Sequence, residues 1–281
     1  MSEVAGAVNI RRALCLAALA FVVAACGEHS VTGPDIPVVP GATTFRGFDT
    51  SIYPGDAAMQ AWKNPGSPYL WSGYYLAAPC HKDATWSGKR ATITAMGWGT
   101  AIIYVGQQTF DGLPDLFAYG DPLFATVSPT CSRTLLSRDQ GLADADDAIA
   151  KTLAEGFPPR SVIYLDLERM DSIPPAMDAY YRAWAEHVLA SQYRPGVYVH
   201  KFNAPAVYVG FTAVYQAAGS TETPRFWLAT AAGFSLTAKP TDIGYSFTNA
   251  WQGILDTDET WNGVRLHIDV DIADRKSPSA P

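Results

Sequence analysis

Residues 161–168 read SVIYLDLE, a stretch in which aliphatic side chains alternate with one aromatic and two acidic side chains. Successive side chains of a strand point to opposite faces, so Tyr164, Asp166 and Glu168 share one face and the aliphatic residues share the other. The Cα atoms of Asp166 and Glu168 would lie roughly 6.5–7 Å apart. This pattern predicts a barrel strand whose apolar face is covered by helices and whose carboxylates point into the lumen at its C-terminal end.

On both sides of this stretch, β-like apolar runs alternate with helical patterns. Strands are predicted at 45–51, 70–77, 100–107, 161–168, 196–201, 225–231, 249–255 and 264–272. Helices are predicted at 56–63, 86–97, 138–155, 174–191 and 203–218. Strand–helix alternation predicts a parallel sheet, and eight strands predict its closure. The predicted fold is an α/β, TIM-like barrel over residues 44–274, with five βα units followed by three strands, and a tail at 275–281.

Further acids fall on two other predicted strands. Residues 47–51 read GFDTS and place Asp49 at the end of the first strand, while alternation in the last strand puts His267, Asp269 and Asp271 on one face. A single acid at a strand end is commonly a loop cap. Several acids in a lumen cost desolvation unless they are paired or take part in chemistry. We therefore predict an acidic site at the mouth of the barrel, where barrel active sites lie.

The composition excludes several classes of protein. With 48% hydrophobic and 12% aromatic residues, the chain has enough apolar material for a large core and is not disordered. The 20 Lys and Arg residues against 27 Asp and Glu give a net charge of −7, which argues against a nucleic-acid partner. Motifs for structural zinc, for a serine nucleophile and for dinucleotide binding are missing from the sequence, so we predict no metal and no cofactor.

The N-terminus is typical of an export signal. Arg11 and Arg12 precede an uncharged, mostly apolar run at 13–25, which is shorter than the roughly 20 residues of a membrane span. The run ends in VAAC at 23–26, which resembles the bacterial lipobox and implies cleavage before Cys26 and lipidation of its thiol. We predict a lipoprotein signal peptide at 1–25, a tether at 26–43 and a lipid anchor in the cell envelope. An ordinary signal peptide that ends beside a cysteine is the alternative.

Two cysteines remain once Cys15 is assigned to the signal and Cys26 to the lipid. Leftover cysteines of an exported chain most often pair, so Cys80 and Cys131 are predicted to form a disulfide. Both follow consecutive predicted strands, which are neighbours in a βα barrel. Closing a loop of about 50 residues stabilises a fold by roughly 4 kcal/mol in the chain-entropy model.

Short motifs on the expected strands carry a resemblance to a known family. GFDTS at 47–51 and DLE at 166–168 resemble the G-[IF]-D-x-S and D-x-E motifs of glycoside hydrolase family 25 lysozymes. AWQ at 250–252 followed by IDVD at 268–271 is similar to their W-Q and V-D-x-N ending. The stretch from GWG at 97–99 to YVGQQ at 104–108 resembles a bacterial glycoside-hydrolase-like domain of unknown function related to those lysozymes. The resemblance covers about 45–274 and implies the same barrel of five βα units plus three strands.

The resemblance implies a glycosidase of the muramidase type that acts on peptidoglycan or a related amino-sugar glycan. It implies that Glu168 is the general acid and that Asp166 orients or stabilises the N-acetyl group of the substrate. Asp49 and Asp269 would complete the acidic cluster. The candidate substrate contacts are Trp227, Trp251, Tyr164 and Asp271; for each Trp taken singly, core packing is the alternative.

Two departures from the lysozyme pattern leave a second interpretation open. The Asn of the V-D-x-N ending is Asp271 in this chain, and the W-Q-Y triplet reads WQG at 251–253. A barrel that binds glycan without cutting it, or that serves as an envelope scaffold, is therefore the alternative, because a fold and a partial site do not establish turnover. Chitinase-type barrels are disfavoured, since their strand-four motif has an Asp where Tyr164 stands.

Overall fold

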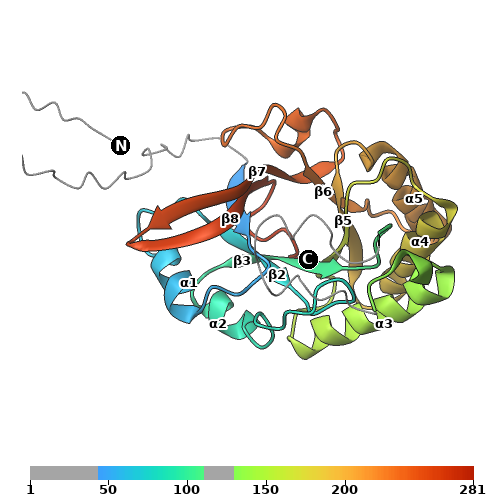
Figure 1. Cartoon of the computed structure of the whole chain (residues 1–281), viewed down its shortest axis with the longest axis horizontal. Coiled ribbons are helices and arrows are strands. Elements are labelled where there is room, and N and C mark those ends of the chain that lie inside the picture. Colours follow the sequence, from blue (N-terminus) through green and yellow to red (C-terminus); the bar gives the residue numbers. More distant parts are fainter. Residues whose placement is uncertain (1–43, 111–129) are drawn as a thin grey trace, which may run out of the picture. The chain divides into compact units, whose positions relative to one another are not determined.

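Eight strands close into a barrel in the order β1 to β8 (Figure 1). The computed structural model describes residues 44–110 and 130–281. The strands are β1 (Phe45–Asp49), β2 (Trp71–Tyr75), β3 (Gly99–Val105), β4 (Val162–Leu167), β5 (Arg194–His200), β6 (Arg225–Ala229), β7 (Thr248–Trp261) and β8 (Val264–Ala273). Each begins within two residues of its predicted start, and the predicted TIM-like α/β barrel is confirmed.

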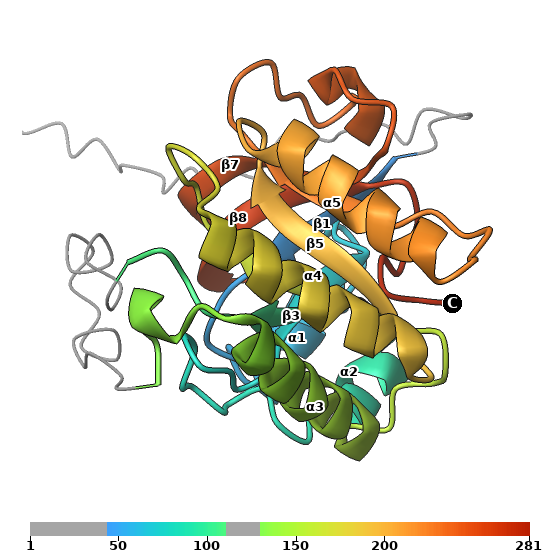
Figure 2. The same ribbon diagram turned by 90° about the vertical axis from the view of Figure 1, so that its right-hand side faces the viewer.

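Helices follow the first five strands and cover the outside of the barrel. In the described residues they are α1 (Asp56–Lys63), α2 (Arg90–Ala95), α3 (Arg138–Ala154), α4 (Pro175–Ala190) and α5 (Ala204–Ala217), with short 3-10 helices η3 (Arg133–Leu135) and η4 (Pro240–Ile243). α3, α4 and α5 pack side by side (Figure 2). The sequence sets their starts: Ser137 caps α3 by accepting the backbone N–H of Gln140, and Pro175 begins α4.

The helix predicted over 86–97 is shorter than expected. Trp86 is buried in edge-on and tilted contacts with Tyr53 and Tyr74, which hold the segment before the helix against the core. Gly88 follows with a φ of 77°, a backbone conformation that an α-helix does not contain. The helix therefore begins only at Arg90.

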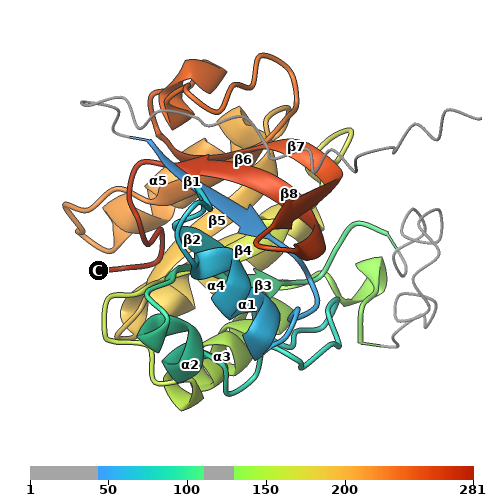
Figure 3. The ribbon, with the colours of Figure 1, turned by 90° about the vertical axis from the view of Figure 1, so that its left-hand side faces the viewer.

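The last strand runs against both of its neighbours. β1 to β7 pair in parallel, whereas β8 is antiparallel to β7 and to β1, beside which it lies in Figure 3. The register pairs Asp49 with Asp269 and Gly47 with Asp271. Later residues of β8 therefore lie deeper in the barrel. The expectation that both acids of this strand reach the mouth is wrong for Asp271.

Aromatic rings fill the part of the lumen below the mouth. Trp227 makes edge-on contacts with Trp71, Tyr164 and Tyr198 at ring-centroid separations of 5.5, 5.8 and 5.3 Å. Gly47 makes room for Trp71, since a Cβ at this position would lie 2.1 Å from the indole ring. These buried rings occupy the lower lumen, and the cavity of the barrel lies at the mouth.

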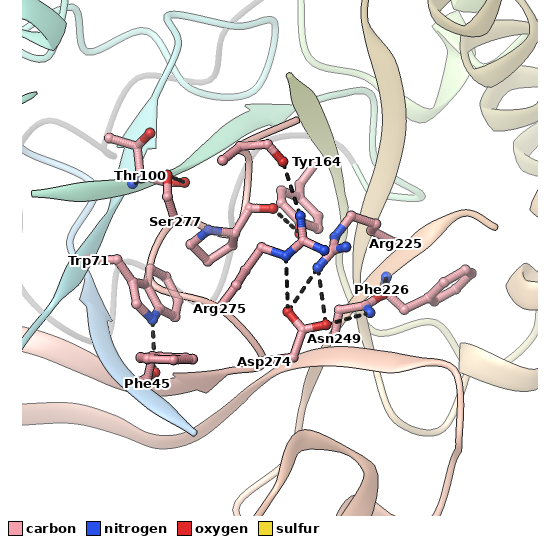
Figure 4. Close-up of polar contacts among 12 residues, drawn as sticks. Phe45, Trp71, Thr100, Tyr164, Arg225, Phe226, Asn249, Asp274, Arg275 and Ser277 are labelled. Atoms are coloured by element: carbon pink, nitrogen blue, oxygen red, sulfur yellow. Dashed lines mark hydrogen bonds and ion pairs between the residues drawn. The ribbon is translucent and has the colours of Figure 1, made fainter. Parts of the chain in front are cut away.

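A polar cluster closes the opposite end of the barrel (Figure 4). Asp274 accepts hydrogen bonds from the guanidinium of Arg225 at 2.8 Å and from the side-chain amide of Asn249 at 3.0 Å. The hydroxyl of Tyr164 donates to the carbonyl of Pro278 at 3.2 Å. These contacts join β4, β6 and β7 to the residues that follow β8.

Ser279 completes this closure between β3 and β4. Its Oγ accepts the backbone N–H of Ile102 at 2.7 Å, and its own N–H donates to the carbonyl of Thr100 at 2.9 Å. Its carbonyl accepts the N–H of Val162 at 2.9 Å. The segment predicted as a tail at 275–281 is therefore part of the barrel, because it takes the place of direct pairing between the first residues of β3 and β4.

Within the described ranges, none of the helices combines the length and the apolar character that crossing a membrane requires. The predicted signal peptide at 1–25, Cys26 and the tether at 26–43 lie outside the described residues.

Candidate active site

A cavity of about 420 Å³ opens at the mouth of the barrel. The residues that line it come from the ends of β1 to β6 and from the β7–β8 ribbon. They are Asp49, Thr50, Ser51, Ile52, Tyr75, Cys80, His81, Ile103, Val105, Asp166, Glu168, Tyr198, Trp227, Gln252, Asp256, His267, Ile268 and Asp269. Five of these are carboxylic acids, and the lining is therefore strongly acidic.

Asp49 and Asp269 are tied together by one amide. The side-chain NH₂ of Gln252 donates to Oδ2 of Asp49 at 2.8 Å and to Oδ2 of Asp269 at 2.9 Å. The second oxygen of Asp49 accepts the hydroxyl of Tyr75 at 2.6 Å, and the second oxygen of Asp269 accepts the backbone N–H of Asp256 at 2.7 Å. All four carboxylate oxygens therefore accept a donor, which fixes both groups in one orientation.

Gln252 is itself held by Tyr198. The hydroxyl of Tyr198 donates to Oε1 of Gln252 at 2.6 Å, which settles the direction of the amide and presents its NH₂ to the two acids. Burial raises the pKa of Asp49, while the hydrogen bonds from Tyr75 and Gln252 oppose the rise. Burial and the charge of Asp49 raise the pKa of Asp269 to about 8.

Asp166 and Glu168 lie on the lumen side at the end of β4, as the alternation of residues 161–168 predicts. Asp166 is only 7% exposed, and its Oδ1 has no hydrogen-bond partner among the described residues. Burial, followed by the charges of Glu168 and Asp49, raises the pKa of Asp166 well above its usual value. Burial also raises the pKa of Glu168, with a backbone hydrogen bond from Arg169 opposing the rise.

The acids therefore divide into two kinds. Asp49 and Asp269 have every oxygen engaged by donors, so they serve as fixed acceptors. Asp166 keeps one buried carboxyl oxygen, Oδ1, without a donor among the described residues, and Glu168 is partly exposed at the cavity. Because several carboxyl groups crowd one buried space, they cannot all ionise together, and the cluster retains protons near neutral pH. Such a site can both donate and accept a proton, as general acid–base chemistry requires.

Several predicted substrate contacts do not line the cavity. Trp227 does, and its indole N–H donates to Oδ1 of the fully buried Asp271 at 3.0 Å below the cavity. Tyr164 is fully buried and its hydroxyl reaches the closed end of the barrel. Trp251 points outward, because its neighbour Gln252 takes the lumen face of β7; the Trp251 indole N–H donates to the carbonyl of Thr230.

The cavity residues that were not among the predicted site residues include Tyr75, Tyr198, Gln252 and His81. His81 is 4% exposed and packs against the ring of Tyr75 at a centroid separation of 5.1 Å. Burial lowers the pKa of His81 to about 4, so the ring is neutral at pH 7. Alternation within residues 71–75 and 194–200 could have placed Tyr75 and Tyr198 on the lumen face; His81 lies in a loop that carries no periodic signal.

The predicted disulfide between Cys80 and Cys131 is present, with the Cα atoms 4.9 Å apart. Cys80 lines the cavity, so the bond anchors the wall of the site beside His81. A disulfide is typical of proteins that leave the reducing cytosol.

In the described residues, no group of three or more His, Cys, Asp or Glu side chains is arranged to hold a metal ion.

A family model for the Rv2525c-like, glycoside hydrolase-like domain matches residues 60–273. The chain belongs to this family. The matched range contains β2 to β8 and all the cavity acids except Asp49. No protein of the curated set matches the chain.

Solved structures share the fold at low sequence identity. An uncharacterised protein from B. stearothermophilus has a TM-score of 0.54 and 18% identity, over 83% of this chain and 97% of that one. The spore cortex lytic enzyme SleM from Clostridium perfringens has a TM-score of 0.51 and 11% identity, over 84% and 68% of the two chains. The modular autolysin LytC from Streptococcus pneumoniae has a TM-score of 0.50 and 11% identity, over 82% of this chain and 46% of LytC. The barrel therefore has the same fold as two lytic enzymes.

Proposed function

We propose that this protein is a glycosidase that cleaves amino-sugar glycan of the bacterial cell envelope, with peptidoglycan as its substrate. The observation that carries the proposal is the placement of Asp166 and Glu168 at one cavity, both with raised pKa values, at the mouth of a glycoside hydrolase-like barrel. The fold shared with SleM and LytC supports the choice of substrate.

Glu168 acts as the general acid in this proposal. Hydrolysis of a glycosidic bond needs a carboxyl group that is protonated near neutral pH and can reach the leaving oxygen. The raised pKa of Glu168 favours its acid form, and its partial exposure at the mouth gives the substrate access to it. Turnover is therefore expected to fall as the pH rises through the pKa of Glu168, because the acid form is lost.

Asp166 acts on the substrate from the deeper position. Its carboxyl group lines the cavity and is suited to accept an N–H of the substrate, such as that of an N-acetyl group. Asp49 and Asp269 are fixed by Gln252, and whichever of the two is ionised would place negative charge beside the reacting sugar, where an oxocarbenium-like transition state gains positive charge.

The test is hydrolysis of a purified peptidoglycan suspension by the wild type and by Glu168→Gln, followed by turbidity and by release of reducing ends. The amide keeps the size of the side chain but cannot donate the proton, so turnover is expected to fall by at least ~100-fold. Asp166→Asn is expected to lower turnover as well.

Glu186→Gln is the matched control. Glu186 lies on α4, and its half-exposed carboxylate pairs with Arg138 away from the cavity, so this variant is expected to keep wild-type turnover. Circular dichroism checks the fold of each variant. Equal rates for Glu168→Gln and the wild type would remove Glu168 from the acid role. A wild type that sediments with peptidoglycan and leaves it intact would instead favour a glycan-binding barrel.

We further propose that the domain works at the envelope surface as a lipoprotein. The lipobox-like VAAC at 23–26 supports lipidation of Cys26, and the Cys80–Cys131 disulfide supports export.

A further inference from the structure

Strand β3 separates from β4 between the two acids of the site, Asp166 and Glu168. The last register pair of the two strands joins Val105 to Asp166, whereas β4 stays paired with β5 for one more residue, through Leu167 and Val199. On the β3 side, the backbone carbonyl of Asp166 and the N–H of Glu168 are thus left without a strand partner. Buried backbone groups of this kind need other partners.

The side chain of Gln108 supplies both partners. Its Nε2 donates to the carbonyl of Asp166 at 3.0 Å, and its Oε1 accepts the N–H of Glu168 at 3.1 Å. The second Nε2 hydrogen is directed to the carbonyl of Gly106, at 3.3 Å. Gln108 is 1% exposed, so these bonds are shielded from water.

This arrangement reproduces a peptide group of a neighbouring strand. In a parallel ladder, one residue bonds to the two residues that flank its partner on the next strand. Its N–H donates to the C=O of the residue before the partner, and its C=O accepts the N–H of the residue after the partner. The Gln108 amide makes the same two bonds across Leu167. It therefore extends the hydrogen-bonding edge of β3 past the point where the backbone turns away, and it keeps β4 extended as far as Glu168.

We propose that Gln108 is a positioning residue for the Asp166–Glu168 pair. The catalytic role of that pair rests on the proposed function, but the placement of Glu168 can be measured without any substrate. An extended backbone at Glu168 puts its side chain on the lumen face with Asp166. Without the amide, the residues after Leu167 are free to rotate, and Glu168 is free to leave the cavity for water.

The adjacent residue offers a matched control. Gln107 is fully buried as well, and its amide also bridges two backbone groups, the carbonyl of Thr130 at 2.8 Å and the N–H of Ser132 at 3.1 Å. It makes no such bridge across β4. Gln107→Met and Gln108→Met therefore each remove a buried side-chain amide that bonds two backbone groups. Only Gln108→Met removes the bonds that hold Glu168.

The first measurement is a ¹³C NMR titration of the side-chain carboxyl carbons in the full protein labelled at Glu, with the Glu168 signal assigned by its loss in Glu168→Gln. We expect the pKa of Glu168 to fall toward the ordinary Glu value in Gln108→Met, because the carboxyl becomes hydrated. It should keep its wild-type value in Gln107→Met. If Gln108→Met fails to fold, Gln108→Asn, whose shorter amide cannot span both groups, takes its place.

The second measurement is the rate of peptidoglycan hydrolysis. Gln108→Met is expected to lower kcat by about 10- to 100-fold with KM within about 2-fold of the wild type, since a catalytic group displaced by about 1 Å costs this much. An unchanged Glu168 pKa together with unchanged kcat in folded Gln108→Met would overturn the role of Gln108. If the wild type hydrolyses no amino-sugar glycan, the proposed function fails, and the NMR titration still decides whether Gln108 positions Glu168.

Discussion

Asp271→Asn is expected to stabilise the protein, and increasingly so as the pH rises. Asp271 is fully buried, its Oδ1 accepts the indole N–H of Trp227, and its carboxyl group also interacts with the carboxyl group of Asp49. Burial, and then the charge of Asp49, raise the pKa of Asp271 well above its usual value. An Asn has nearly the same shape, keeps an acceptor for Trp227 and carries no charge to desolvate.

The sign of the pH dependence follows from proton binding. The folded state holds the Asp271 proton more tightly than the unfolded chain, whose Asp pKa is about 3.9. The free energy of unfolding of the wild type therefore decreases as the pH rises from about 4 through the folded pKa, by at most ~1.4 kcal/mol per pH unit for one proton. The Asp271→Asn variant lacks this loss. The difference in free energy of unfolding between the variant and the wild type therefore grows by at most ~2.7 kcal/mol from pH 5 to pH 7.

The assay is urea denaturation of the oxidised protein at pH 5, 6, 7 and 8, followed by tryptophan fluorescence. Asp171→Asn is the control for the substitution itself, because the Asp171 side chain is 97% exposed and its replacement should change the free energy of unfolding little. A difference between Asp271→Asn and the wild type that stays constant or shrinks as the pH rises would refute the reasoning, since Asp271 would then not hold an extra proton in the folded state.

Two further predictions concern the ends of the chain. Ser279→Ala should lower the free energy of unfolding by about 1–3 kcal/mol, because the buried N–H of Ile102 loses its acceptor; urea denaturation checks this against Ser87→Ala, an exposed position expected to have no effect. Cys26→Ser should move the protein from the membrane fraction to the soluble fraction of the producing cells, and equal membrane association of the two forms would contradict lipidation at Cys26.

The barrel could be predicted because its strands carry a strong local signal. In residues 161–168 the alternation alone assigns Asp166 and Glu168 to the lumen, and the structure places both at the cavity. The same rule applied to β7 places Gln252 inside and Trp251 outside. The motif resemblance drew attention to the tryptophan instead, whereas the glutamine holds Asp49 and Asp269.

Other parts of the site had no signal of this kind. The depth of Asp271 depends on the antiparallel direction of β8, which alternation within one strand does not reveal. The role of Gln108 depends on where β3 leaves β4, and that separation is a property of two segments about 60 residues apart. Long-range geometry of this kind is fixed by packing, not by the local pattern of side chains.

The closure made by Ser279 has a consequence for the order of folding. Ile102 and Ser279 are 177 residues apart in the sequence, yet their hydrogen bond belongs to the seam between β3 and β4. During synthesis, β3 and β4 leave the ribosome long before Ser279, the residue that joins the first residues of these two strands. Until then the seam exposes unpaired N–H and C=O groups to other chains, and contacts so distant in sequence form slowly. The barrel therefore completes the seam between β3 and β4 only when these late residues are in place.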